Sequence, residues 1–343
     1  MTRFTKSVTV TTAALVSLVV LISAPGEQGK TAANSASGRL MSSRAASCAA
    51  LLKDGRLLIT GGEVNKTTVA TAELFSVVRG ASDAAPMSTP RLEHACATLT
   101  DGRVLVVGGS TTGGTALNTA EIFDPVSGAW SNAGILTTPR VGATASLLQG
   151  GKVLIAGGAT PTGVLSSVEL YDPVTKTSQF APQPMASKRS QHAAAVLGNA
   201  KVLIAGGTDG TNALDSLEMY DPASSTFAPA GKLSQSRSGL SSTTLLDGRV
   251  YLAGGSDGKR EFSSTEIYNP KDGTVKAAAS MGAPRTNHLA LRLSQNNAVL
   301  IVGGKGNGQI MAGAAQRSKI RPETRIRPSG PLTRNCCSHP IQT

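Results

Sequence analysis

The sequence has 343 residues, few aromatic side chains (3 %, with a single tryptophan) and a formal net charge of +12. That charge is concentrated at the two ends: residues 1–43 carry +3 and residues 305–343 carry +6, which leaves only +3 for residues 44–304. A surface that tracks phosphates needs basic residues on the folded body, with aromatic side chains to stack on bases. The charge distribution therefore argues against nucleic acid as a partner.

Residues 1–24 are typical of a secretory signal peptide. Two basic residues, Arg3 and Lys6, precede an apolar stretch that ends at the small residue Ala24. The uncharged part is 18 residues long, so an uncleaved membrane anchor is the alternative. In either case we expect the remaining chain to be secreted or to lie in the periplasm or cell envelope. Residues 25–37 are expected to form a linker.

A short motif, an apolar run followed by two glycines, recurs along most of the chain. Its copies recur every 47 to 49 residues, and a fixed period of this size is typical of repeat architectures. The second glycines of the six copies are Gly62, Gly109, Gly158, Gly207, Gly255 and Gly304.

One unit, residues 91–139, shows the order of the expected elements. Residues 94–99 should form a first strand, and Asp101-Gly102 a two-residue type I′ turn, in which both residues need positive φ. The second strand, residues 103–107, reads Arg-Val-Leu-Val-Val without alternation, as strands do when both faces of their sheet are covered. A polar loop follows its two glycines.

The third strand, residues 120–125, reads Ala-Glu-Ile-Phe-Asp-Pro and has close copies in four other units. Its Asp-Pro pair favours a turn, after which a fourth strand contains Trp130. Four short antiparallel strands per unit, repeated about six times, predict an all-β propeller, because a ring of blades limits exposed sheet edges.

The double glycines, the Glu-x-Tyr-Asp-Pro strand and Trp130 resemble the Kelch-repeat family in its bacterial form, within the galactose oxidase-like propellers. The resemblance implies six four-stranded blades over residues 38–304, with seven as the alternative. It also implies that a leading strand at residues 38–44 closes the ring by completing the last blade.

The pattern decays after Gly304. Where Glu-x-Tyr-Asp-Pro is due, the sequence continues from Gln316 without that motif. Residues 305–343 are therefore expected to be a degenerate last-blade segment with a basic tail. A frameshifted tail is the alternative, and either terminus could complete the last blade.

Each unit begins with an arginine, and the third strands supply a repeated glutamate. The arginines could form a collar for an anionic ligand or brace the strands internally by pairing with these glutamates; a feature present in every unit favours the brace. The glutamates are Glu73, Glu121, Glu169, Glu218 and Glu266.

Three histidines, His94, His192 and His288, follow the arginine of alternate units. A six-bladed ring would space them with threefold symmetry, which zinc accepts, but an open channel is too wide for three imidazoles to reach one ion. Copper sites of galactose oxidase-like proteins use tyrosine and histidine ligands, whereas the tyrosines here are mostly repeat positions. We therefore expect no metal and no cofactor.

Four cysteines are too few for a disulfide framework in a chain of this length. Cys48 and Cys96 lie in copies of the same strand, one position out of register, so their side chains face opposite sides. Free thiols are therefore expected at both positions.

The sequence favours a monomeric, non-catalytic binding or scaffold protein that engages a protein or polysaccharide, because its reactive residues are mostly copies of one another. No membrane contact is expected beyond the alternative anchor. The binding face should be the one with the unit-starting arginines and the loops after Gly-Gly. Its candidate residues are Arg91, Arg140, Arg189, Arg237, Arg285, Asp209, Asn212, Asp257, Lys259 and Arg260.

Two other functions stay open. The first is a secreted carbohydrate-active enzyme, a sugar isomerase or oxidase on the same scaffold, which a unique acid/base pair at the channel mouth would favour. The second is an inert remnant with a damaged last blade, which failure of residues 305–343 to pack would favour.

Overall fold

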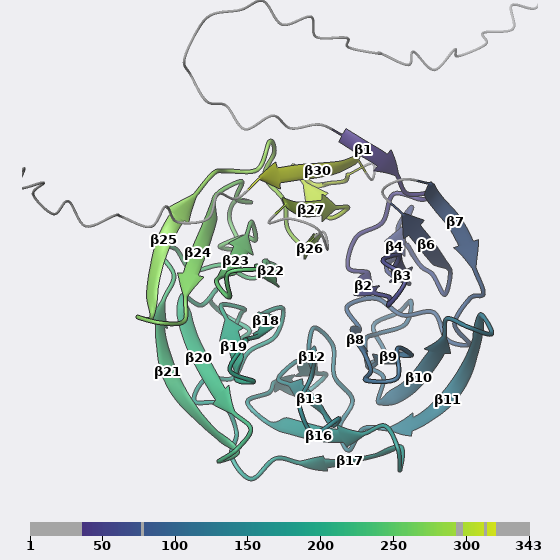
Figure 1. The fold of residues 1–343 in the computed structure, drawn as a ribbon, viewed down its shortest axis with the longest axis horizontal. Helices are drawn as coiled ribbons and strands as arrows, with labels where there is room; N and C mark the ends of the chain where they lie inside the picture. Colours follow the sequence, from purple (N-terminus) through teal and green to yellow (C-terminus); the bar gives the residue numbers. More distant parts are fainter. Residues whose placement is uncertain (1–35, 77–78, 293–297, 312–313, 320–343) are drawn as a thin grey trace, which may run out of the picture. The chain divides into compact units, whose positions relative to one another are not determined.

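The computed structural model describes residues 36–76, 79–292, 298–311 and 314–319, all within one compact unit. Their regular elements are all β-strands, arranged as radial sheets around a central axis (Figure 1), which confirms the predicted all-β propeller. No helix in these ranges has the length and apolar character needed to span a membrane. The expected signal peptide and the chain beyond residue 319 lie outside the described residues.

Five sheets are each built from one sequence unit, with the first strand next to the axis and the fourth at the rim. Their strands are β2 (Cys48–Leu51), β3 (Leu57–Thr60), β6 (Ala72–Ser76) and β7 (Gly80–Ala84); β8 (Ala95–Thr98), β9 (Val104–Val107), β10 (Thr119–Asp124) and β11 (Ala129–Ile135); β12 (Thr144–Leu147), β13 (Val153–Ala156), β16 (Val168–Asp172) and β17 (Thr177–Phe180); β18 (Ala193–Val196), β19 (Val202–Ala205), β20 (Ser216–Asp221) and β21 (Thr226–Lys232); and β22 (Ser241–Thr244), β23 (Val250–Ala253), β24 (Thr265–Asn269) and β25 (Thr274–Ala278).

The sixth four-stranded sheet takes its strands from both ends of the described chain. In order from the axis it contains β26 (Leu289–Arg292), β27 (Ala298–Val302), β30 (Ala314–Lys319) and β1 (Ala36–Arg39). Strand β1 is antiparallel to β30, with Ala36 opposite Gln316. The leading strand therefore ends at residue 39, earlier than the sequence suggests, and the segment with the decayed pattern still provides a third strand.

Three two-stranded hairpins directly follow Gly-Gly pairs. They are β4 (Glu63–Val64) with β5 (Thr67–Thr68), β14 (Ala159–Thr160) with β15 (Gly163–Val164), and β28 (Lys305–Gly306) with β29 (Gln309–Ile310).

The core is divided into six apolar clusters, each between two neighbouring sheets. Every residue of β9 is buried, as the continuous apolar run predicts for a strand covered on both faces. One cluster joins the sixth sheet to the first by packing Leu300 against Ile59 and Phe75. The apolar packing is therefore continuous around the axis.

In the five units whose turn after the first strand is described, this turn differs from the predicted type I′ turn. Leu99 N–H donates to the carbonyl of Arg103, and Gly102 N–H donates to the carbonyl of Leu99 at 2.9 Å, so the loop has three residues. Gly102 has φ of 97°, whereas Asp101 is not among the residues with positive φ. This is the arrangement of a type I turn with a left-handed residue at its end, which needs only one glycine.

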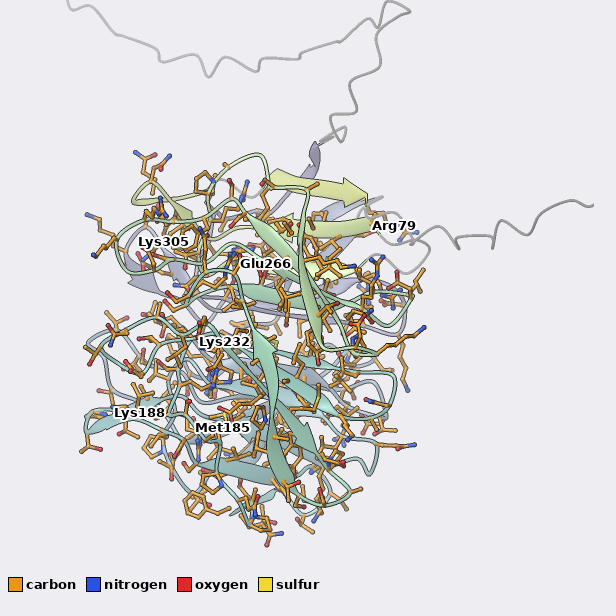
Figure 2. All side chains as sticks on the ribbon, turned by 90° about the vertical axis from the view of Figure 1, so that its left-hand side faces the viewer. Arg79, Met185, Lys188, Lys232, Glu266 and Lys305 are labelled. Carbon is orange, nitrogen blue, oxygen red and sulfur yellow. A yellow bond between two sulfur atoms is a disulfide. The ribbon has the colours of Figure 1, made fainter. Side chains whose placement is uncertain are left out.

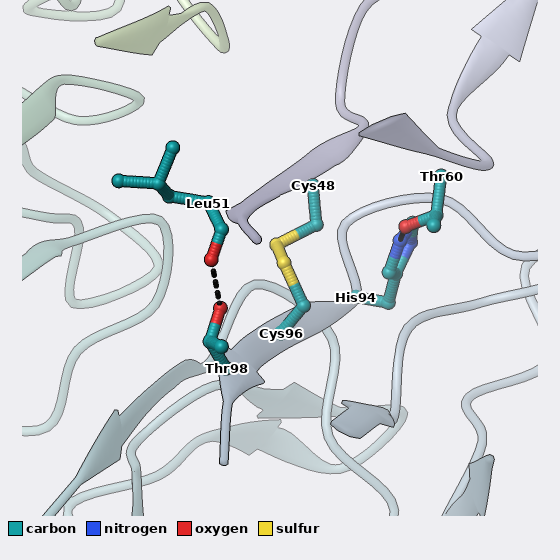
Figure 3. Close-up of a disulfide and its surroundings, with 6 residues drawn as sticks. All are labelled: Cys48, Leu51, Thr60, His94, Cys96 and Thr98. Atoms are coloured by element: carbon teal, nitrogen blue, oxygen red, sulfur yellow. Dashed lines mark hydrogen bonds between the residues drawn. A yellow bond between two sulfur atoms is a disulfide. The ribbon is translucent and has the colours of Figure 1, made fainter. Parts of the chain in front are cut away.

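Cys48 and Cys96 form a disulfide, with 6.0 Å between their Cα atoms (Figure 3), so the expectation of free thiols was wrong. The two side chains face opposite sides of their own sheets, but neighbouring sheets stand face to face around the axis. The side of β2 that carries Cys48 therefore lies against the side of β8 that carries Cys96. The same approach allows the Thr98 hydroxyl to donate to the Leu51 carbonyl at 2.8 Å.

Removing this disulfide is expected to lower the free energy of unfolding by about 2–4 kcal/mol, since the closed loop spans 48 residues and limits the unfolded chain. Urea unfolding with and without dithiothreitol measures the effect in a background where Cys336 and Cys337 are serine. The Cys48→Ser/Cys96→Ser variant should have the same free energy of unfolding as the reduced protein, and dithiothreitol should not change it. Equal midpoints for the reduced and oxidised protein would contradict the prediction.

Candidate binding face at the channel mouth

The loops before each first strand and after each second strand lie on one face of the ring. Figure 2 shows this edge-on: Lys188 and Lys305, which belong to these two kinds of loop, lie toward one side, and Arg79, from a turn between third and fourth strands, lies toward the other. Backbone bridges such as Val141 to Ala159 tie the two kinds of loop together. We call this side the channel-mouth face.

The unit-starting arginines of the first five units are buried beneath this face and paired with the third-strand glutamates. In the third unit Arg140 and Glu169 are both fully enclosed, with Nη2 2.9 Å from Oε1. The Arg140 Nη1 atom also donates to the Gly157 carbonyl at 2.7 Å. The other pairs are Arg44–Glu73, Arg91–Glu121 (2.8 Å), Arg189–Glu218 (2.6 Å) and Arg237–Glu266 (2.8 Å).

These pairs are internal braces between the start of a unit and its third strand, as the sequence favours. The same burial removes Arg91, Arg140, Arg189 and Arg237 from the binding surface for which they were also candidates. Desolvation lowers the pKa of Arg140, and the Glu169 carboxylate opposes that shift. The guanidinium groups support the face from below and do not present donors to a ligand.

The sixth arginine departs from this pattern. Arg285 is 6 % exposed, and its Nη1 donates to the Gly303 carbonyl at 3.0 Å. Its Nε is enclosed without a hydrogen-bond partner, as are those of Arg44, Arg91 and Arg189. It differs from them because no ion pair to it occurs among the described residues.

The three histidines point sideways into the preceding sheets and not toward a common ion. Each Nε2 shares a hydrogen bond with a hydroxyl: His94 with Thr60 (2.8 Å), His192 with Thr144 (2.9 Å) and His288 with Ser241 (2.8 Å). In the described ranges, no group of three or more histidine, cysteine, aspartate or glutamate side chains could hold a metal. Burial lowers the pKa of each histidine to about 3, with the neighbouring arginine acting in the same direction.

A closed ring of backbone hydrogen bonds lines the channel mouth. The residue two positions after each arginine donates its N–H to the carbonyl of the residue at the equivalent position in the preceding unit. The N–O distances are 2.7–3.3 Å. All six residues have φ between 51° and 67°, a conformation that only glycine adopts without strain. They are Ala46, Glu93, Gly142, Gln191, Gly239 and Asn287.

Two unlike side chains of this ring meet over the mouth. Gln191 Nε2 donates to Glu93 Oε1 at 2.8 Å, above the small Gly142. Burial raises the pKa of Glu93, whereas the bond from Gln191 and the charge of Lys305 act in the other direction. Lys305 in turn pairs with Glu63 at 2.9 Å, between the sixth and first units.

The repeated pattern does not indicate this cluster, because that pattern consists of the residues that the units share. Glu93 occupies a position that is different in almost every unit, and that variability was the available signal. The ring residues line a cavity of about 140 Å³, which adjoins a channel cavity of about 350 Å³ along the innermost strands.

Of the predicted loop residues on the channel-mouth face, Asn212, Lys259 and Arg260 are exposed, and Asp209 and Asp257 are half-buried. The Asp209 carboxylate accepts N–H bonds from Thr211 (2.8 Å) and Asn212 (2.7 Å) and so shapes its loop. In the next unit Asp257 binds the N–H groups of Lys259 and Arg260 in the same way.

Arg260 combines exposure with a fixed position. Its side chain is 70 % exposed, and its guanidinium carbon lies 5.5 Å from the centre of the Phe262 ring. Its Nε also lies 3.6 Å from Asp257 Oδ2, so the ring and this carboxylate together hold the guanidinium in place at the surface.

The radial four-stranded sheets, their Gly-Gly ends and the Arg–Glu braces define a Kelch-type β-propeller. The KLHDC2/KLHL20/DRC7 Kelch-repeats domain matches residues 46–255, and the Kelch motif matches residues 237–282. The chain therefore belongs to the Kelch-repeat family.

Among solved structures, the chain is similar to that of YjhT, with a TM-score of 0.69 and 14 % sequence identity. The similarity covers 83 % of this chain and 97 % of the YjhT chain, and at this identity it shows the fold alone. No protein with a curated description matches the chain.

Proposed function

We propose that this protein is an exported, non-catalytic binding or scaffold propeller of six blades that engages a protein or polysaccharide through its channel-mouth face. One observation carries the proposal: the residues that repeat are buried, while the loops that differ between units are exposed together on one face. A rigid frame with variable loops on one side is the usual arrangement of a recognition surface.

The chemistry of the exposed loops suits a polar partner. Asp209 and Asp257 direct their carboxylates toward their own loop backbones, and Asp257 Oδ2 also lies 3.6 Å from Arg260 Nε. The exposed polar side chains of these loops are Asn212, Lys259 and Arg260. Hydroxyl-rich chains and polar peptide surfaces both supply matching acceptors and donors.

Export is supported by two independent features. Residues 1–24 have the order of a secretory signal, and the Cys48–Cys96 disulfide is of a kind that persists in oxidising compartments. Detection of the mature protein outside the cytoplasm, with its disulfide intact, tests this part of the proposal.

A pair of charge-matched variants tests the binding face. Lys259→Ser/Arg260→Ser removes two exposed cations from the proposed face. Lys271→Ser/Lys276→Ser removes two exposed cations away from that face, one in the turn between β24 and β25 and one in β25 at the rim. On polysaccharide and protein arrays, the first variant is expected to lose at least about tenfold in affinity for any ligand of the wild type, since each lost charged hydrogen bond is worth ~1.5–3 kcal/mol. The second should bind like the wild type. Equal affinity of both variants would reject this face.

The Glu93 cluster favours a second candidate function, a carbohydrate-active enzyme. The Glu93 carboxyl group lies at the channel mouth, is hydrogen-bonded to Gln191 and has a raised pKa. A general acid or base needs a fixed position and a pKa shifted toward the working pH. Incubation with a panel of free sugars, followed by NMR for isomerisation and a peroxide assay for oxidation, tests it. Turnover that disappears in Glu93→Gln, while the melting temperature stays, would support the enzyme; no turnover by the wild type would reject it.

A further inference from the structure

The Cys48–Cys96 disulfide lies beside the central channel. Its two cysteines belong to β2 and β8, the strands next to the axis in the first and second sheets (Figure 3). Both residues are half-buried, and both line the channel cavity of about 350 Å³. This covalent link between two packed sheets is therefore partly accessible to solvent.

The core side of the disulfide is closed. Cys96 packs against the apolar cluster between the first and second sheets, in which Leu58 and Val106 are fully buried. Solvent cannot reach the sulfur atoms through this cluster. The exposed part of the two cysteines therefore faces the channel cavity that they line.

The channel has the size for a small molecule and is too narrow for a folded protein. Its walls include small side chains of the innermost strands, such as Ala49, Ala145 and Ala194. The cavity lies near the lower end of the ~300–1,000 Å³ range of small-molecule pockets, and it adjoins the cavity of about 140 Å³ at the mouth. A thiol carried by a folded protein therefore cannot reach the sulfur atoms, whereas a small free thiol can.

His94 does not assist attack on the disulfide. Its imidazole, two residues before Cys96, shares a hydrogen bond with the Thr60 hydroxyl at 2.8 Å. Burial lowers the pKa of His94 to about 3, so the ring is neutral and does not stabilise a thiolate beside it. Exchange at this disulfide therefore depends on the incoming thiolate and on its access to a sulfur atom.

We propose that Cys48–Cys96 is a site of thiol–disulfide exchange for small-molecule thiols, which enter at the channel mouth while the ring stays folded. The thiolate of a small thiol attacks one Sγ, the Sγ–Sγ bond breaks, and the other Sγ leaves as a thiolate that takes a proton from water. A second thiolate then attacks the mixed disulfide. This step releases the first cysteine as a thiol and leaves the small thiol oxidised as its own disulfide.

The site lies close to the ring of backbone hydrogen bonds at the channel mouth. Ala46 and Glu93 belong to that ring, two residues before Cys48 and three residues before Cys96. Glu93 N–H donates to the Ala46 carbonyl at 2.8 Å. Reduction of the disulfide leaves this contact between the first two units without a covalent link beside it. The proposal is independent of what the channel-mouth face binds.

Dithiothreitol is the small-thiol probe, on the folded full chain without denaturant and in a Cys336→Ser/Cys337→Ser background. Free thiols are counted by acid quench, alkylation and intact mass. We expect a rate of reduction that is proportional to the dithiothreitol concentration and rises above the rate of unfolding in the same buffer. A rate that never exceeds the unfolding rate would overturn the proposal, because the thiol would then reach the disulfide only in unfolded chains.

Reduced thioredoxin at the same thiol concentration supplies the protein-sized comparison. It should reduce the folded chain no faster than the chain unfolds, although it should reduce the same chain readily in urea. If thioredoxin reduced the folded chain faster than the chain unfolds, the disulfide would be open to protein thiols and the proposal would fail.

One variant tests the entrance at the mouth. Ala46 lines the mouth cavity, and the equivalent ring position of the fourth unit already carries a glutamine, Gln191, with φ of 51° against 54° for Ala46. Ala46→Gln should therefore narrow the entrance without strain. We expect slower reduction by dithiothreitol and an unchanged rate of unfolding. Reduction as fast as in the parent protein would reject entry at the mouth.

Discussion

Acidification is expected to unfold this protein well above pH 3, because the three buried histidines cannot accept protons in the folded state. Their pKa is about 3 when folded, against about 6.5 in an unfolded chain. Above pH ~6.5 neither state binds these protons, and stability is unaffected. Below that value only the unfolded chain binds them, so the free energy of unfolding falls until the folded pKa is reached.

The expected effect is large because the three sites act together. Three protons give a limiting slope of about 4 kcal/mol per pH unit, against a total stability of ~5–15 kcal/mol for a typical domain. Glu93 acts in the opposite direction, since its raised pKa makes the folded state bind that proton more readily. Urea unfolding between pH 7.5 and 4.5, followed by circular dichroism, measures the slope.

The repeats supply the control. The third unit has Ala143 at the position of His192, so His192→Ala installs a residue that this position already tolerates. The variant loses the bond to Thr144 and with it some stability at neutral pH, but its limiting slope should fall by about one third. An unchanged slope would mean that His192 is not a source of the acid sensitivity.

The second large effect is expected from Glu169→Gln, which leaves the Arg140 guanidinium buried without a counter-charge. Removing one partner of a buried pair costs ~3–5 kcal/mol, and Glu169 also accepts bonds from Thr137, Thr138 and Ser178. The free energy of unfolding in urea at neutral pH should fall by that amount.

Two comparisons separate this brace from an ordinary ion pair. Asp215→Asn breaks the exposed pair with Lys232, whose side chains are 43 % and 74 % exposed, and should cost less than about 1 kcal/mol. The double variant Arg140→Leu/Glu169→Leu should be less destabilised than Glu169→Gln, because it leaves no buried charge. A cost for Glu169→Gln no larger than that for Asp215→Asn would refute the brace.

The sequence by itself determined the architecture. The Gly-Gly pairs, the unbroken apolar run of residues 103–107 and the Glu-x-Tyr-Asp-Pro strands specify each unit locally, since strand and turn formation depend on near neighbours. The Arg–Glu brace could also be predicted, because an arginine and a glutamate that recur in five units among apolar strands are buried charges, and buried charges need partners. Prediction succeeded for the strands and the brace, which lie within one unit, whereas the type of the turn after the first strand was wrong.

Tertiary structure decided what happens between units. Cys48 and Cys96 appear mismatched along the sequence, and only the face-to-face packing of two sheets brings their opposite sides together. The same holds for Glu93, which reaches Gln191 across the ring from 98 residues away. The position of Gln316 opposite Ile301, where the third unit has Glu169 opposite Ile155, is likewise fixed by strand pairing and not by a motif. Contacts across the ring depend on how the sheets close around the axis, and no local pattern in the sequence carries that information.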